Sequence, residues 1–131
     1  MARVLFVCLQ NAGRSQMCQA IFATMAPEHH QARSAGTRPA LRVHPKVVRA
    51  LREVGIDIGG REPQLLTDEL ARWADLVVTM GCGDQCPLIP GKRYLDWQLT
   101  DPSHLSLAQV RAVRDRIKDC VAELIADLER T

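Results

Sequence analysis

The chain has 131 residues, a length that predicts one domain over residues 1–131 with a buried core of its own. Its 17 basic and 15 acidic side chains leave a net charge of +2, which argues against a protein that binds nucleic acid or a charged membrane surface. Five cysteines are the unusual feature. No apolar run is long enough for a secretory leader or a membrane span, so we expect a cytoplasmic protein with reduced thiols.

Buried-strand and amphipathic-helix patterns alternate along the chain. In order, they predict a strand over 4–7, a helix over 15–26, a strand over 31–34, a helix over 45–54, a short helix capped by Thr67, a strand over 76–78 and a long helix over 107–128. This alternation predicts an α/β fold, a single doubly wound sheet of about four parallel strands flanked by helices. Such sheets bind ligands beyond the carboxyl ends of their strands.

A Cys-x5-Arg motif, Cys8 to Arg14, stands where the first strand passes into the first helix. A loop of this kind turns its backbone N–H groups and the helix N-terminus toward one point, which suits a tetrahedral oxyanion. Arg14 can hold two anion oxygens, the helix terminus favours the Cys8 thiolate, and Ser15 can donate a hydrogen bond to its sulfur. Gly13 removes a Cβ where the backbone turns tightly. The expected oxyanion-binding residues are Leu9, Gln10, Asn11, Ala12, Gly13, Arg14 and Ser15.

The remaining cysteines divide into a pair and two single residues. Cys82 and Cys86 would be about 13 Å apart on an extended strand but about 6 Å apart in a helical or looped segment, within reach of a disulfide. A zinc site that joins them to His44 or His104 is the alternative, although the spacing is a weak zinc signal. Cys18 and Cys120 lie in helical patterns and are interpreted as packing residues.

The segment from Val4 to Met17 resembles the active-site segment of the low-molecular-weight protein tyrosine phosphatase fold, and more narrowly the arsenate reductases built on it. Segments 34–37, 54–58, 75–87, 96–97 and 100–102 continue the resemblance in the family's order. It implies that Cys8 is the nucleophile, that Arg14 holds the oxyanion and that Asp101 is a general acid. Read without the resemblance, Asp101 before Pro102 is an ordinary turn aspartate.

The resemblance further implies a disulfide relay. Cys8 attacks arsenate, Cys82 then attacks the Cys8 sulfur as arsenite leaves, and Cys86 takes over the disulfide, which thioredoxin or another small thiol reductant reduces. Phosphate and sulfate are expected to compete with arsenate. A monomer with no metal is expected.

Three other functions stay open. Phosphate monoester hydrolysis needs only Cys8, Arg14 and Asp101, but a phosphotyrosine slot needs aromatic walls and aromatic residues are 4% of the chain. Ser103 also stands where the phosphatases have a tyrosine. A mycothiol-coupled reductase would need one catalytic cysteine only. A non-catalytic oxyanion-binding or redox-sensing module would show neither activity.

Two further expectations concern polar residues near these elements. In some relatives an acidic residue, together with the asparagine matched by Asn11, helps to bind potassium, and Gln19 stands in its place here. The chain is therefore expected to require no cofactor, and a monovalent cation is left as an open alternative. His29 and His30 adjoin a helix end and are expected to be solvated.

Overall fold

The computed structural model describes residues 1–80 and 91–130, so Cys82 and Cys86 lie outside the described residues. The elements in chain order are β1 (Arg3–Cys8), α1 (Arg14–Met25), β2 (Gln31–Gly36), α2 (Pro45–Arg52), α3 (Asp68–Trp73), β3 (Leu76–Thr79), β4 (Arg93–Asp96), a 3-10 turn (Pro102–His104) and α4 (Leu107–Glu129). Each element expected from the sequence is present at or near its expected position. β4 had not been located, because its burial is only partial and its apolar pattern is short.

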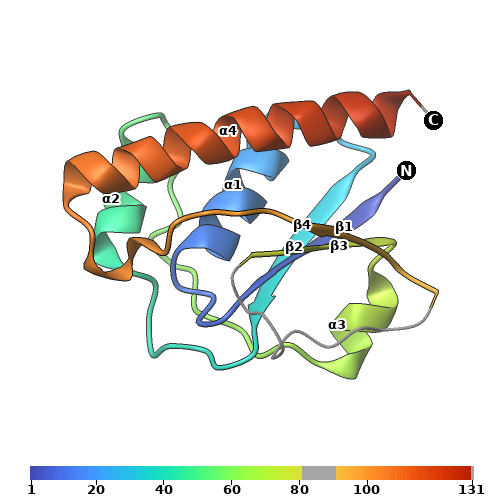
Figure 1. Cartoon of the computed structure of the whole chain (residues 1–131), viewed down its shortest axis with the longest axis horizontal. Helices are drawn as coiled ribbons and strands as arrows, with labels where there is room; N and C mark the ends of the chain where they lie inside the picture. The colour runs from blue at the N-terminus through green and yellow to red at the C-terminus, as the bar shows by residue number, and fades with distance from the viewer. Residues whose placement is uncertain (81–90, 131) are drawn as a thin grey trace.

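The strands form one parallel sheet in the order β2-β1-β3-β4, which confirms the expected fold class. β1 is central, with Phe6 paired to Ser34 of β2 on one side and to Val78 of β3 on the other. Figure 1 shows α4 across one side of the sheet with α1 and α2 beneath it, while α3 lies on the opposite side. The result is a three-layer arrangement in which the sheet is the middle layer and β1 is a central strand.

Side chains of β1 alternate between two apolar clusters because successive residues of a strand point to opposite faces. Val4, Phe6 and Cys8 belong to the cluster shared with α1, α2 and α4. Leu5 and Val7 belong to a smaller cluster that includes residues of α3. All five are buried, as expected for a strand covered on both faces. This alternation places the Cys8 side chain on the same face of the sheet as α1.

The helix termini follow the local signals in most cases. The Thr67 hydroxyl accepts the Leu70 N–H at the start of α3, and Ser106 and Gln109 form a capping box at the start of α4. The expected end of α2 was wrong. The helix stops at Arg52, and Val54, predicted to belong to its apolar stripe, is 51% exposed in the turn before Gly55.

The expectation for His30 was also wrong, since its side chain is 3% exposed. The backbone N–H of Ala2 donates to His30 Nδ1 at 3.0 Å, and the ring packs edge-on against Phe22. His29 is half exposed, as expected. Chain segments from both ends of the sequence cover His30, and no local pattern reveals such burial.

Among the described helices, none is long and apolar enough to cross a bilayer.

Candidate active site

Cys8 occupies the switch point of the sheet. The chain leaves β1 toward β2 on one side and later returns as β3 on the other, so the two connections diverge at the carboxyl end of β1. Parallel α/β sheets bind ligands at this point. Cys8 is the last residue of β1 and is 2% exposed. Met80, just after β3, donates its N–H to the Val7 carbonyl at 3.0 Å, so the segment after β3 starts beside Cys8.

The loop after Cys8 turns its peptide carbonyls outward. The carbonyls of Cys8, Leu9, Gln10 and Ala12 accept hydrogen bonds from the N–H groups of four residues in the neighbouring segment 37–44. In a trans peptide the next residue's N–H points opposite to the carbonyl. The N–H groups of residues 9, 10, 11 and 13 therefore point to the inner side of the loop, and no described residue accepts a backbone hydrogen bond from them. The loop has the donors that an oxyanion needs.

Gly36 allows β2 to pass close to this loop. A Cβ at Gly36 would lie 2.7 Å from the Leu9 carbonyl oxygen and 2.8 Å from the Asn11 nitrogen. Real Cβ atoms essentially never approach other atoms this closely. Gly36 lies in segment 34–37, which resembles the family's pattern, and its physical reason is a backbone contact between segments about 25 residues apart.

Asn11 adopts a left-handed backbone conformation with φ of +49°, which among non-glycine residues asparagine tolerates best. Its Oδ1 accepts from Gln64 N at 2.8 Å and from Gln16 Nε2 at 3.0 Å. Its Nδ2 donates to Ser15 Oγ at 2.7 Å. Asn11 is fully buried, so its side-chain hydrogen bonds stabilise the conformation of the loop.

Ser15 Oγ lies 2.9 Å from Cys8 Sγ, the contact expected from the sequence. Because Ser15 Oγ already accepts the Asn11 amide, its own hydroxyl proton is free to point to the sulfur. A hydroxyl donor stabilises a thiolate more than a thiol. The arrangement thus favours a nucleophilic Cys8.

Arg14 and Asp101 meet although 87 positions separate them. Arg14 is 7% exposed, its Nη1 donates to the Leu99 carbonyl at 3.3 Å, and its Nη2 lies 3.8 Å from Asp101 Oδ2. The other Asp101 oxygen accepts the Ser103 N–H, so this residue also caps the 3-10 turn, as its ordinary interpretation predicts. The Asp101 side chain is 52% exposed and reaches solvent above the loop.

Gly13 allows that meeting. Its φ of −139° and ψ of −92° lie outside the helical and extended regions, which fits the tight turn expected there. The structure adds a second reason for glycine, since a Cβ at Gly13 would lie 2.7 Å from Pro102 Cγ and 3.4 Å from His44 Cδ2. The absence of that Cβ brings the segment with Asp101 and Pro102 against the loop.

The ionisable groups near the loop differ in character. Burial lowers the pKa of His44, and the opposing effect of Asp101 is smaller, so His44 is neutral at pH 7. Burial raises the pKa of the Cys18 thiol well above its usual value, and the neighbouring Cys8 and Cys120 raise it further. Burial also raises the pKa of Cys120. Both thiols are protonated at neutral pH, which agrees with the packing role expected for them.

Among the described residues, one group of three side chains has the proximity of metal ligands. Atoms of His29, His30 and Glu129 lie within 4.8 Å of one another, at the end of α4. The Ala2 N–H donates to His30 Nδ1, so Nε2 is the ring nitrogen that carries a proton, and it lies 3.4 Å from Glu129 Oε1. A metal would need the lone pair of that same nitrogen. The group therefore fits an electrostatic contact between His30 and Glu129 better than a metal site.

The structure brings together Cys8, Arg14, Ser15 and Asp101, four of the residues singled out from the sequence. Cys82 and Cys86 belong to the segment outside the described residues. Sequence reasoning missed the role of Gln16, whose buried amide nitrogen reaches both oxygens of Asn11. A polar residue among the buried positions of α1 was the one signal that could have indicated it.

The chain matches one family model and several curated proteins. Residues 3–131 match the model described as low molecular weight phosphotyrosine protein phosphatase. The glutaredoxin arsenate reductase of Synechocystis sp. is 36% identical over 131 residues, which cover 98% of this chain and 99% of that protein. The putative arsenate reductase of Halobacterium salinarum is 40% identical over 126 residues, which cover 91% and 87%.

Solved structures agree with this relationship. An arsenate reductase in the phosphate binding state has a TM-score of 0.86 and 36% identity, covering 97% of this chain and 98% of that one. The Corynebacterium glutamicum thioredoxin-dependent arsenate reductase has a TM-score of 0.83 and 40% identity, but the match spans only 62% of that longer chain. The YwlE arginine phosphatase of Geobacillus stearothermophilus has a TM-score of 0.89 at 25% identity, covering 99% and 94%.

Proposed function

Since this chain belongs to the low molecular weight phosphotyrosine protein phosphatase family, and within it to the arsenate reductases, we propose that it reduces arsenate to arsenite at Cys8. The observation that carries the proposal is the contact between Ser15 Oγ and Cys8 Sγ at the base of a loop whose N–H groups point inward. A nucleophilic sulfur and a tetrahedral-anion site therefore share one position. Arsenate is a tetrahedral oxyanion of the charge and shape that this loop suits.

In the first step, the Cys8 thiolate attacks arsenic and a bond forms between sulfur and arsenic. Arg14 and the loop N–H groups hold the remaining oxygens as their charge changes. One oxygen leaves as water once it is protonated, and Asp101 supplies the proton. The 3.8 Å separation between Asp101 Oδ2 and Arg14 Nη2 supports this assignment, because it puts the carboxyl beside the group that would hold the anion.

In the second step, the Cys82 thiolate attacks the Cys8 sulfur. A disulfide forms, the bond between sulfur and arsenic breaks, and its electron pair stays on arsenic, so two thiols are oxidised as arsenic(V) becomes arsenic(III). Cys86 then attacks Cys82 and releases the Cys8 thiolate. The position of Met80 supports this relay, because its N–H donates to the Val7 carbonyl at 3.0 Å, next to the nucleophile, and Cys82 and Cys86 follow Met80 in the sequence.

The enzyme returns to its starting state when an external dithiol reduces the Cys82–Cys86 disulfide. We propose thioredoxin for this step, as the name of the Corynebacterium relative states for that protein. The glutaredoxin arsenate reductase of Synechocystis gives a specific reason to test glutaredoxin beside it. Either reductant requires the reducing compartment expected from the sequence.

Arsenate-dependent NADPH oxidation tests the relay, with thioredoxin and thioredoxin reductase in one arm and glutathione, glutaredoxin and glutathione reductase in the other. Cys8→Ser should abolish turnover, and Cys82→Ser or Cys86→Ser should leave at most about one turnover per enzyme. Cys120→Ser is the matched control and should retain wild-type turnover. Sustained thioredoxin-coupled turnover by Cys82→Ser would refute the proposed relay.

Slow phosphate ester hydrolysis is a second candidate activity, favoured by the structural likeness to the YwlE arginine phosphatase. It would use the same nucleophile and acid, with water in place of Cys82 at the second step. The two activities separate in one variant: Cys82→Ser should hydrolyse p-nitrophenyl phosphate at the wild-type rate while it loses arsenate reduction. Asp101→Asn should reduce both activities, by about 100-fold or more.

A further inference from the structure

We propose that the side-chain amide of Gln16, and not a bound monovalent cation, holds the anion-binding loop of this protein in its working shape. Gln16 is then a positioning residue, acting on Cys8 through Asn11 and Ser15. The inference goes beyond arsenate reduction, since it concerns the loop itself and applies to any oxyanion that the loop binds.

The Gln16 amide occupies the place where a cation would gather oxygen atoms. Its Nε2 donates to the Asn11 carbonyl at 3.2 Å, to Asn11 Oδ1 at 3.0 Å and to the Glu62 carbonyl at 3.4 Å. Gln64 N also donates to Asn11 Oδ1 at 2.8 Å. An amide oxygen has two lone pairs, so Oδ1 is saturated by these two donors. No ligand capacity remains on the side-chain oxygen of the asparagine that relatives use for potassium.

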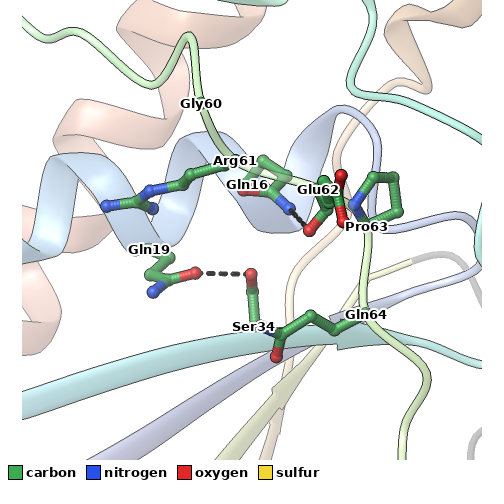
Figure 2. A pocket seen from close by; sticks show the side chains of 8 residues that line it. All are labelled: Gln16, Gln19, Ser34, Gly60, Arg61, Glu62, Pro63 and Gln64. Carbon is green, nitrogen blue, oxygen red and sulfur yellow. Dashed lines mark hydrogen bonds between the residues drawn. The ribbon is translucent and has the colours of Figure 1, made fainter.

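The pocket behind the loop lacks the charge that would attract a cation. Figure 2 shows this pocket, of about 430 Å³, with the side chains of Gln16, Gln19, Ser34, Arg61, Glu62 and Gln64 around it. Among the described residues that line it, Arg61 and Glu62 are the only charged ones, and their charges cancel. The lining therefore adds no net negative charge to attract a cation, and the side-chain oxygens of Asn11 and Gln19 already accept hydrogen bonds.

Gln19 replaces the acidic residue of potassium-binding relatives, and its amide is engaged as well. Its Oε1 accepts the Ser34 hydroxyl at 2.6 Å, as Figure 2 shows. Its Nε2 donates to the Ala32 carbonyl at 3.4 Å. Gln19 and Ser34 thus form a neutral hydrogen bond between α1 and β2. A carboxylate at position 19 would need a counter-ion. The residues present do not fit a potassium site.

Gln16 Oε1 is a buried oxygen without a hydrogen-bond partner among the described residues. This oxygen does not create a cation site. The Nε2 atom of the same amide, and not Oε1, faces the Asn11 oxygens, and a single oxygen atom does not satisfy an alkali cation. The burial of this atom is a cost of about 1–3 kcal/mol for a polar group without a partner. The protein tolerates it because the two N–H donors at the other end of the same amide are shared among three oxygen acceptors.

The consequence for Cys8 follows the same network. Asn11 has the unfavourable φ of +49°, which the contacts from Gln16 and Gln64 hold in place. Asn11 in that position donates to Ser15 Oγ, which leaves the Ser15 proton for the Cys8 sulfur. Loss of the Gln16 amide removes the hydrogen bond that holds Asn11. It should therefore weaken both anion binding and the reactivity of Cys8.

The first experiment compares potassium with choline at constant ionic strength. The melting temperature and the affinity for inorganic phosphate are measured for wild type, Gln19→Glu and the matched control Gln31→Glu, which adds the same charge at an exposed site at the start of β2. Wild type and Gln31→Glu should be indifferent to potassium. Gln19→Glu should be indifferent too, because the Gln16 amide and Gln64 N still occupy the Asn11 side-chain oxygen that a cation would need. A rise of about 5 °C in the melting temperature of Gln19→Glu, as expected for potassium at about ten times its dissociation constant, would show that charge alone excludes the cation and would overturn the role of the amide. A potassium-dependent shift in wild type would overturn the proposal.

The second experiment removes the amide while it keeps the volume. Gln16→Met should bind phosphate about tenfold more weakly, and iodoacetamide should alkylate its Cys8 about tenfold more slowly at pH 7, as followed by peptide mass spectrometry. Potassium should restore neither property. Wild-type phosphate affinity and alkylation in Gln16→Met would overturn the role of Gln16. If this variant does not fold, the potassium comparison decides the proposal by itself. Neither readout uses arsenate, so failure here is distinct from failure of the proposed reduction.

Discussion

Gly36→Ala should distort the backbone of the anion-binding loop without replacing any catalytic side chain. The new Cβ would lie 2.7 Å from the Leu9 carbonyl oxygen, about 0.7 Å short of the 3.4 Å at which ordinary contact begins. The other close atoms, Asn11 N and Gln10 C, are backbone too, so no side chain can rotate away. The loop must therefore move by about half an ångström or more.

That displacement is large compared with the tolerance of an oxyanion site, where donors stand 2.7–3.1 Å from the anion. We expect phosphate affinity to fall at least about tenfold, or about 1.4 kcal/mol, and the free energy of unfolding to fall by about 1–3 kcal/mol. Phosphate titration calorimetry and thermal denaturation measure the two effects. Gly60→Ala is the control, because its Cβ would meet nothing within 4 Å. Equal phosphate affinity in the two variants would refute the steric argument.

Three further predictions address other parts of the molecule. Ser15→Ala should slow the alkylation of Cys8 at pH 7 by about tenfold, because it removes the hydroxyl 2.9 Å from the sulfur, and unchanged alkylation would contradict that role. Ile117→Ala should lower the free energy of unfolding by about 2–5 kcal/mol in a urea titration, since Ile117 is fully buried on the inner face of α4. Arg111→Gln should alter acid stability. The hydrogen bond from Arg111 lowers the pKa of Glu53 to about 2, so this stabilisation is present at neutral pH and is lost as pH falls from about 4.5 toward 2. Melting curves across that window should therefore fall less steeply in the variant than in wild type.

The fold was largely predictable because its signals are local. The apolar run of β1, the capping box of α4 and the motif from Cys8 to Arg14 each lie within a few residues of sequence. The short helix after Thr67 also began where its cap predicted. β4 was not located, because a partly exposed edge strand has no continuous apolar run, and pairing with β3 defines it.

The candidate site was predictable only in part. The contact between Ser15 and Cys8 was predictable from sequence spacing, because Cys8 ends a strand and Ser15 lies in the first turn of the helix that follows. Asp101 had two interpretations in the sequence, and in the structure it makes both contacts, with Ser103 and with Arg14. The role of Gln16 could not be predicted, because its partners Asn11 and Glu62 meet only through the packing of α1 against the segment that follows α2.

The sequence by itself determined where the nucleophile stands: a cysteine at the end of a buried strand, before a helix that starts with an arginine and a serine. Those relations depend on φ, ψ and side-chain alternation over about ten residues. Only the tertiary structure decided which distant groups complete the site. Because Gly13 has no Cβ, Pro102 can pack against it. Because Gly36 has no Cβ, the loop at Leu9 can lie directly against β2. Such contacts join segments whose separation in sequence carries no information about their separation in space, so they form only when the sheet and its covering helices are packed.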